Sequence, residues 1–358
     1  MAALQATLYG VSRGGWDAEG RPSARELAAH NAALRRDAVG LGVVLALFLS
    51  SARAFADARP SRQFVAACQP GEQLARGAAG LLCALGAASA LAVDLLVCPC
   101  PAVSDAKYRA IRVLGHFAYL TVQSLAIIST HLAISALADV CLDPLVAPLL
   151  PASVTRAALA LHAASHMHAE WVCALALVLA LFFFPLALLH PQWEADEVRP
   201  WRRRGVGSFK ALNLYSHGAA VPCALLELLL LRSRPLLAQL APPFRVLAAV
   251  SIAYGSVYPL SVHIGYNLHE MRRVALERAR AQRADSALPR VKSHPTHAWP
   301  YGFMDDLAQL GAPPMRLHSW GVRPPFSAGW VLLALAGTAS NLLVLACVRQ
   351  LHVSARES

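Results

Sequence analysis

Seven long stretches of the chain carry almost no charged side chains, and this pattern limits the fold more than any other feature. Stretches of about 18 or more apolar residues are typical of helices that cross a bilayer, and about 21 helical residues match a hydrocarbon thickness of about 30 Å. We therefore predict an all-α fold, a polytopic transmembrane helical bundle. The stretches lie at 38–56, 77–98, 111–133, 169–190, 211–231, 245–266 and 328–348.

The composition supports an integral, multi-pass membrane protein. Hydrophobic residues make up 56% of the 358 residues and charged residues only 15%. A soluble domain of this size could not cover so much apolar surface with polar side chains. The first stretch is interrupted by Arg53, an arginine near a helix end that can reach the lipid headgroups. We therefore predict six or seven spans.

The basic residues lie in the connections between the apolar stretches. A net charge of +11 distributed in this way favours anionic lipid headgroups over nucleic acid as the partner. With seven spans, most lysines and arginines fall on the side of the N-terminus, which places that terminus and the 267–327 loop in the cytosol. The arginine-rich segment 271–283 indicates a helix that faces solvent or headgroups.

The chain divides into three parts by composition. Residues 1–37 form a polar arm without a signal peptide, in which a capping box at Ser23 predicts a short surface helix ending near Arg35 and Arg36. Residues 38–350 form the transmembrane helical domain, with a basic insertion at 268–298, and 351–358 form a short tail. The predicted locations are the endoplasmic reticulum, other endomembranes or the plasma membrane. The sequence leaves the oligomeric state open.

Ionisable side chains inside a span are costly and therefore mark candidate sites. Asn213 and His217 are four residues apart, so they share one helix face about one to two turns below the membrane surface. The imidazole could act as a general base, with the Asn213 side chain fixing its tautomer. Alternatively, the two side chains form an interhelical hydrogen bond that only holds the bundle together.

Two further groups admit both a functional and a structural interpretation. Thr121 is a nucleophile if a base lies within reach, and otherwise its hydroxyl bonds back to a helix carbonyl. His162, His166 and His168 precede Glu170 at spacings that suit a metal, but the HExxH arrangement is missing and we place the group at a helix entry, solvated by water. We expect no metal and no cofactor.

One motif resembles a known family. Asn213, His217, Pro222 and Glu227 have the spacing Asn-x3-His-x4-Pro-x4-Glu, which is similar to the androgen-induced gene family of multi-pass membrane proteins. Weaker likenesses follow the family's order and bring the covered region to about 110–348. They are the pair Glu170-Trp171 at the start of a span, the interval from Tyr254 to His263, and the segment 299–303.

The resemblance implies an activity. Members of the family look like threonine hydrolases that cleave esters of fatty acids with hydroxy fatty acids, and the histidine of the motif is catalytic. Carried over, it makes His217 the base and Thr121 the nucleophile, with membrane lipids and a lipid ester as partners. Asn213 would orient the imidazole, and Tyr254 or His263 would donate a hydrogen bond to the oxyanion.

The sequence departs from the family at the nucleophile. The family's threonine precedes a glutamine by seven residues, and the same interval before Gln123 falls on His116. Thr121 instead lies within a family-like Tyr-Leu-Thr. Two other functions therefore stay open: a non-enzymatic transporter or receptor-like lipid-binding bundle, and an inactive lipid-binding relative in which His116 replaces the nucleophile.

Overall fold

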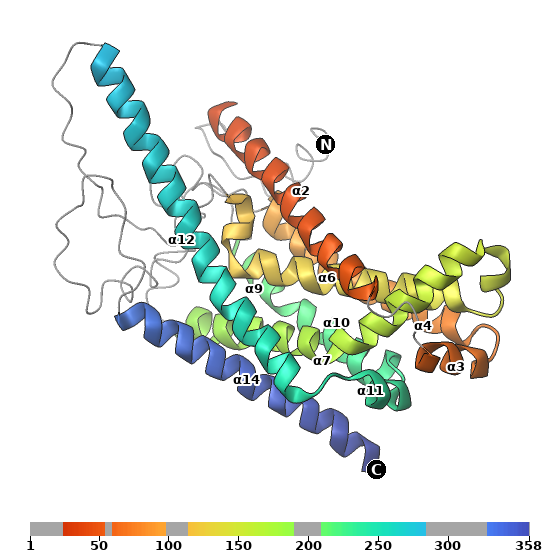
Figure 1. The fold of residues 1–358 in the computed structure, drawn as a ribbon. Coiled ribbons are helices and arrows are strands. Elements are labelled where there is room, and N and C mark those ends of the chain that lie inside the picture. The colour runs from red at the N-terminus through yellow and green to blue at the C-terminus, as the bar shows by residue number, and fades with distance from the viewer. Residues whose placement is uncertain (1–23, 54–58, 98–113, 190–208, 284–327, 358) are drawn as a thin grey trace.

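The computed structural model describes residues 24–53, 59–97, 114–189, 209–283 and 328–357, and every regular element in them is a helix (Figure 1). The longest are α2 (Ala24–Arg53), α7 (Ala152–Leu189), α12 (Phe244–Arg283) and α14 (Ala328–Glu357). The bundle is completed by α3 (Arg59–Ala67), α4 (Glu72–Ala92), α6 (Leu120–Leu142), α9 (Phe209–Gly218), α10 (Ala220–Leu226) and α11 (Arg234–Leu240).

Short turns of other helix types join these elements. Two are π-helical: η1 (Val93–Val97) continues α4, and η7 (Glu227–Leu231) continues α10. Two are 3-10 turns: η4 (Gly115–Ala118) precedes α6, and η5 (Ala147–Leu149) precedes α7. π-helical turns inside helices are rare and occur frequently at functional sites.

Four helices in the described residues are long and apolar enough to cross a membrane, at Glu72–Leu95, Leu120–Leu142, Ala152–Pro185 and Lys210–Leu231. A fifth span arises if α11 and the first part of α12, which meet at 77°, are one broken span. These helices are compatible with an integral membrane protein of four or five spans. The six or seven expected spans are not confirmed, because neither α2 nor α14 yields a candidate and the apolar part of α14, Leu335–Leu351, is short.

Several predicted boundaries were wrong. The span predicted at 111–133 begins nine residues later, because 3-10 turn η4 precedes α6. The helix predicted at 169–190 is α7 and begins at Ala152, so Glu170 and Trp171 lie in its interior and do not open a span. The surface helix expected to end near Arg35 and Arg36 continues as α2 to Arg53. The arginine-rich segment 271–283 is helical and continues α12, which projects beyond the other helices (Figure 1).

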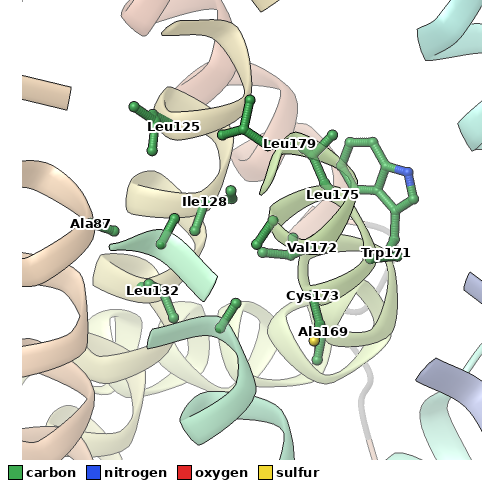
Figure 2. Close-up of a cluster of buried hydrophobic side chains, with 14 of the residues drawn as sticks. Ala87, Leu125, Ile128, Leu132, Ala169, Trp171, Val172, Cys173, Leu175 and Leu179 are labelled. Atoms are coloured by element: carbon green, nitrogen blue, oxygen red, sulfur yellow. The ribbon is translucent and has the colours of Figure 1, made fainter. Parts of the chain in front are cut away.

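The apolar core lies where α4, α6 and α7 pack together. Leucine and isoleucine side chains of α6 point towards Val172, Leu175 and Leu179 of α7 (Figure 2). On the opposite side, Gly77 of α4 lies so close to α6 that a Cβ atom there would be 2.9 Å from the Ala136 carbonyl oxygen. Small residues at helix contacts let backbones approach closely, which is a main source of helix association in membranes.

A carboxylate of α2 fixes the turn that leads into α6. Asp37 Oδ1 accepts hydrogen bonds from the His116 backbone N–H at 2.7 Å and the Phe117 N–H at 3.4 Å. Gly115 has a φ of 65°, and a Cβ atom at that position would be 2.4 Å from Asp37 Oδ1. The turn therefore needs glycine, both for its left-handed backbone and for the approach of the carboxylate. This contact sets where α6 begins.

A second carboxylate, Asp143, joins the end of α6 to the beginning of α4. Its two oxygens accept from the backbone N–H groups of Gly71 at 3.2 Å, Leu74 at 2.9 Å and Leu145 at 2.9 Å. Burial disfavours the ionised carboxylate, but the backbone N–H donors outweigh that effect and hold the pKa of Asp143 below its ordinary value. The two helices that flank the core are thus tied together at one end.

Candidate functional site

The predicted nucleophile and base are in contact. Thr121 Oγ1 lies 2.8 Å from His217 Nε2, a normal hydrogen-bond distance, although the residues are 96 positions apart in sequence. Both side chains are buried, with 4% of Thr121 and 8% of His217 exposed. The pair is thus enclosed by protein and does not face the lipid.

The other ring nitrogen of His217 determines which way this hydrogen bond runs. His217 Nδ1 lies 2.8 Å from the Asn213 backbone carbonyl oxygen, which can only accept. The proton is therefore on Nδ1, and Nε2 is left as the acceptor for the Thr121 hydroxyl. The prediction that the Asn213 side chain orients the imidazole was wrong, because the backbone carbonyl one helical turn earlier does so.

The local sequence explains how both residues reach this position. Thr121 is the second residue of α6, directly after η4, and His217 lies in the last turn of α9. Pro222 has no N–H to bond to the Gly218 carbonyl, so the helix is interrupted there and resumes as α10 at Ala220. The break follows His217 immediately, so the imidazole lies at a helix end.

The structure adds one acidic residue that the sequence analysis missed. Asp94, in π-helical turn η1, lies close to the Ser216 side chain, whose hydroxyl donates to the Asn213 carbonyl oxygen at 3.1 Å. The Ser216 oxygen is in turn 3.2 Å from His217 Nδ1. Asp94 is a charged residue within the apolar stretch 77–98, and that isolated charge was the signal that could have identified it.

Two phenylalanine side chains of α7 lie next to the Thr121–His217 pair. The Phe183 ring stacks on the His217 ring with a centroid distance of 3.5 Å and an interplanar angle of 14°. Phe184 lies 3.2 Å from the position of a Cβ on Gly218, next to His217. Phe184 also lines a groove of about 380 Å³ on α7, together with Leu177, Ala180, Leu181, Pro185 and Leu188.

The remaining predicted site residues do not take part in the Thr121–His217 hydrogen bond. His116 lies in η4, where its Nδ1 is 2.6 Å from Asp37 Oδ2 and both side chains are 2% exposed. Tyr254 reaches α6 one turn further on, with its hydroxyl 3.4 Å from Ser124 Oγ. His263 lies on α12, but its side chain falls outside the described residues. The Trp299 segment of the resemblance also lies outside them.

The histidines of α7 are not at a helix entry. His162 and His166 are each 1% exposed, and they lie inside the bundle, which corrects the prediction that water solvates them. Within the described ranges, no group of three or more histidine, cysteine, aspartate or glutamate side chains could hold a metal ion. His162 and His166 are therefore buried polar residues in the helical core.

Comparison of the chain with protein-family models, curated proteins and solved structures gives no match. The chemistry of the site is therefore inferred from its geometry alone. A hydroxyl bonded to a neutral imidazole, whose other nitrogen is held by an acceptor, is the arrangement of a nucleophile activated by a general base.

Proposed function

We propose that the chain is an intramembrane hydrolase of lipid esters in which Thr121 is the nucleophile and His217 the general base. The observation that carries this proposal is the 2.8 Å contact between Thr121 Oγ1 and His217 Nε2, with Nδ1 held by a carbonyl. The resemblance to the androgen-induced gene family further suggests esters of fatty acids with hydroxy fatty acids as substrates. No cofactor takes part in the proposed reaction.

The first half of the reaction forms an acyl-enzyme. Thr121 Oγ1 attacks the ester carbonyl carbon while its proton moves to His217 Nε2. The tetrahedral intermediate then collapses, the ester C–O bond breaks, and the departing alkoxide oxygen takes the proton from Nε2. The products of this half are an alcohol and an acyl group on Thr121.

The second half uses water in the same way. His217 Nε2 takes a proton from a water molecule as its oxygen attacks the acyl carbonyl carbon. Collapse breaks the bond to Thr121 Oγ1, which recovers the proton from Nε2. The product is a free carboxylic acid, and the enzyme returns to its starting state.

The beginning of α6 supports the step in which negative charge develops. Thr121 is the second residue of this helix, so the carbonyl oxygen of an ester that Oγ1 attacks develops its negative charge near the positive end of the helix dipole. Fixed dipoles aimed at developing charge contribute strongly in an enclosed site of low polarity. In this account Tyr254 of α12, whose hydroxyl lies 3.4 Å from Ser124 Oγ, remains the candidate donor of a hydrogen bond to the oxyanion.

The surroundings of the pair support a substrate with a long apolar chain. The groove on α7 is lined only by carbon side chains and includes Phe184, which lies 3.2 Å from the position of a Cβ atom on Gly218, next to His217. In this proposal, the groove holds the apolar chain of the substrate. Asp94 and Ser216 line the opposite, polar side of the imidazole.

Purified full-length protein assayed on a branched fatty acid ester tests the proposal. Thr121→Ala and His217→Gln should each lower kcat by about 10²–10⁴-fold, the range associated with loss of general-base or nucleophilic assistance. Ser129→Ala, which removes a buried hydroxyl about two turns further along α6, is the matched control and should retain turnover. Full turnover in both site variants would refute the assignment.

A non-enzymatic transporter or lipid-binding protein is the second candidate function. One observation favours it: buried ionisable side chains also occupy α6, α7 and η7 far from Thr121. This function predicts that a radiolabelled fatty acid ester binds or crosses a proteoliposome membrane uncleaved. Hydrolysis that depends on Thr121 would exclude it as the main activity.

A further inference from the structure

A cluster of charged side chains lies buried at the end of the bundle opposite Thr121. The Arg232 guanidinium bonds both oxygens of Asp139, and its Nε lies 2.9 Å from Glu227 Oε1. The Ser135 hydroxyl donates to the same Glu227 oxygen. The three charged side chains are at most 3% exposed. At 1.5 Å per residue, Asp139 lies about 27 Å along α6 from Thr121.

The charges of this cluster do not balance. Two carboxylates face one guanidinium, so full ionisation leaves one uncompensated negative charge, which costs several kcal/mol inside a protein. Arg76 on α4 does not supply the missing charge, because its Nη2 is paired at 2.8 Å with Glu72. Glu227 Oε2 is buried and has no hydrogen-bond partner among the described residues. A bound cation or proton is therefore needed.

Histidines of α7 and α6 extend the cluster into the bundle. His162 Nε2 lies 3.4 Å from Asp139 Oδ1, and the His162 and His166 ring centroids are 4.4 Å apart. His166 Nε2 and both ring nitrogens of His131 are buried without a partner in the described part of the chain. The titratable or charged groups that face the cluster are, from the residue after α3, Cys68; from α4, Arg76 and Cys83; from α6, His131 and Asp139; from α7, His162, His166 and His168; and from η7 and the residue after it, Glu227 and Arg232.

We propose that Glu227, Asp139, Arg232 and His162 form a proton-binding site in which the two carboxylates share one exchangeable proton. The added proton makes the cluster neutral, because one carboxylate then matches one guanidinium. Asp139 lies three residues before the end of α6, about 5 Å along the helix axis from that end.

The proton-binding site is separate from the proposed hydrolase site. Packed side chains of α6 and α7, among them Leu125, Ile128 and Val172, occupy the space between the two (Figure 2). The proposed proton-binding site does not depend on whether the chain hydrolyses esters.

Infrared spectroscopy of the full-length protein in phosphatidylcholine nanodiscs tests the proposal. At neutral pH, a protonated carboxylic acid gives a carbonyl band that is absent for a carboxylate and shifts in D2O. We expect a band in the wild type that Glu227→Gln removes. Asp139→Asn should also remove it, because a single carboxylate then matches Arg232 and no added proton is needed. Glu72→Gln, which alters an exposed carboxylate, is the control and should leave the band intact.

Two results would overturn the proposal. The first is a wild-type spectrum from which neither Glu227→Gln nor Asp139→Asn removes any carboxylic acid band. The second is a band that disappears when sodium or potassium ions are added, which would identify the bound charge as a metal cation. Size-exclusion chromatography checks that each variant is folded, and the two variants report on the site independently if one of them fails this check.

Discussion

The close contact of α4 with α6 gives a quantitative prediction for Gly77→Ala. A Cβ atom at Gly77 would lie 2.5 Å from Val140 Cγ2 and 2.9 Å from the Ala136 carbonyl oxygen. Carbon atoms in favourable contact are about 3.5–4.0 Å apart, so the helices would have to separate by roughly 1 Å. The Asp143 carboxylate opposes that movement, because it bonds the beginning of α4 to the end of α6.

The free-energy change follows from two opposing effects. Alanine gains about 1 kcal/mol over glycine in a helix interior. Overpacking of a tight contact costs about 1–3 kcal/mol. Gly42→Ala in α2 is the matched control, since a Cβ atom there would meet no atom within 4 Å and only the helix gain applies. Gly77→Ala should therefore be about 1–3 kcal/mol less stable than Gly42→Ala.

Thermal unfolding in a mild detergent, followed by circular dichroism, measures the difference. With roughly 2–4 °C per kcal/mol, the Tm of Gly77→Ala should lie roughly 2–12 °C below that of Gly42→Ala. Val140→Ala removes one of the two clashes and should recover part of the loss in the Gly77→Ala background, although alone it is destabilising. Equal Tm values for the two glycine variants would refute the reasoning about close helix packing.

Three further predictions concern the site and its support. Asn213→Ala should change ester turnover by less than about twofold, because the backbone carbonyl holds His217; a loss above about tenfold (1.4 kcal/mol) in kcat would show that the side chain matters. Asp94→Asn should lower kcat by about tenfold with KM unchanged, as positioning through Ser216 requires, and a change in KM alone would contradict that role. The low pKa of Asp143 stabilises the fold above the unfolded value of about 3.9, and this stabilisation is lost as pH falls through the lower folded value. Asp143→Asn should therefore lose about 1–3 kcal/mol at neutral pH and show a flatter Tm between neutral and acidic pH, and a Tm curve parallel to that of the wild type would refute this.

The sequence predicted the helical class and most of the core spans because apolar stretches carry that information locally. It failed at helix boundaries that are determined by a tertiary contact. The late beginning of α6 depends on Asp37 binding the turn at Gly115, 78 positions away, and no local pattern reveals that contact. The long α7 was missed because His162 and His166 look like a solvated entry, yet neighbouring helices enclose them.

The sequence analysis predicted the two central residues of the candidate site but not the groups around them. Thr121 and His217 were chosen from residue type and a motif, and the fold brings them within hydrogen-bonding distance. A sequence does not show which atom of Asn213 faces the His217 ring. We therefore predicted a contact from the Asn213 side chain, whereas the structure has one from its backbone carbonyl. Asp94 was missed because its partner Ser216 lies on another helix. Their catalytic roles stay predictions.

Covalent labelling of the nucleophile tests the central claim most directly. A fluorophosphonate probe reacts with hydroxyls that a general base activates, and mass spectrometry of the digested protein locates the adduct. The account predicts one adduct, on Thr121, that is lost in Thr121→Ala and in His217→Gln. An adduct on another residue, or undiminished labelling of Thr121 in His217→Gln, would contradict it.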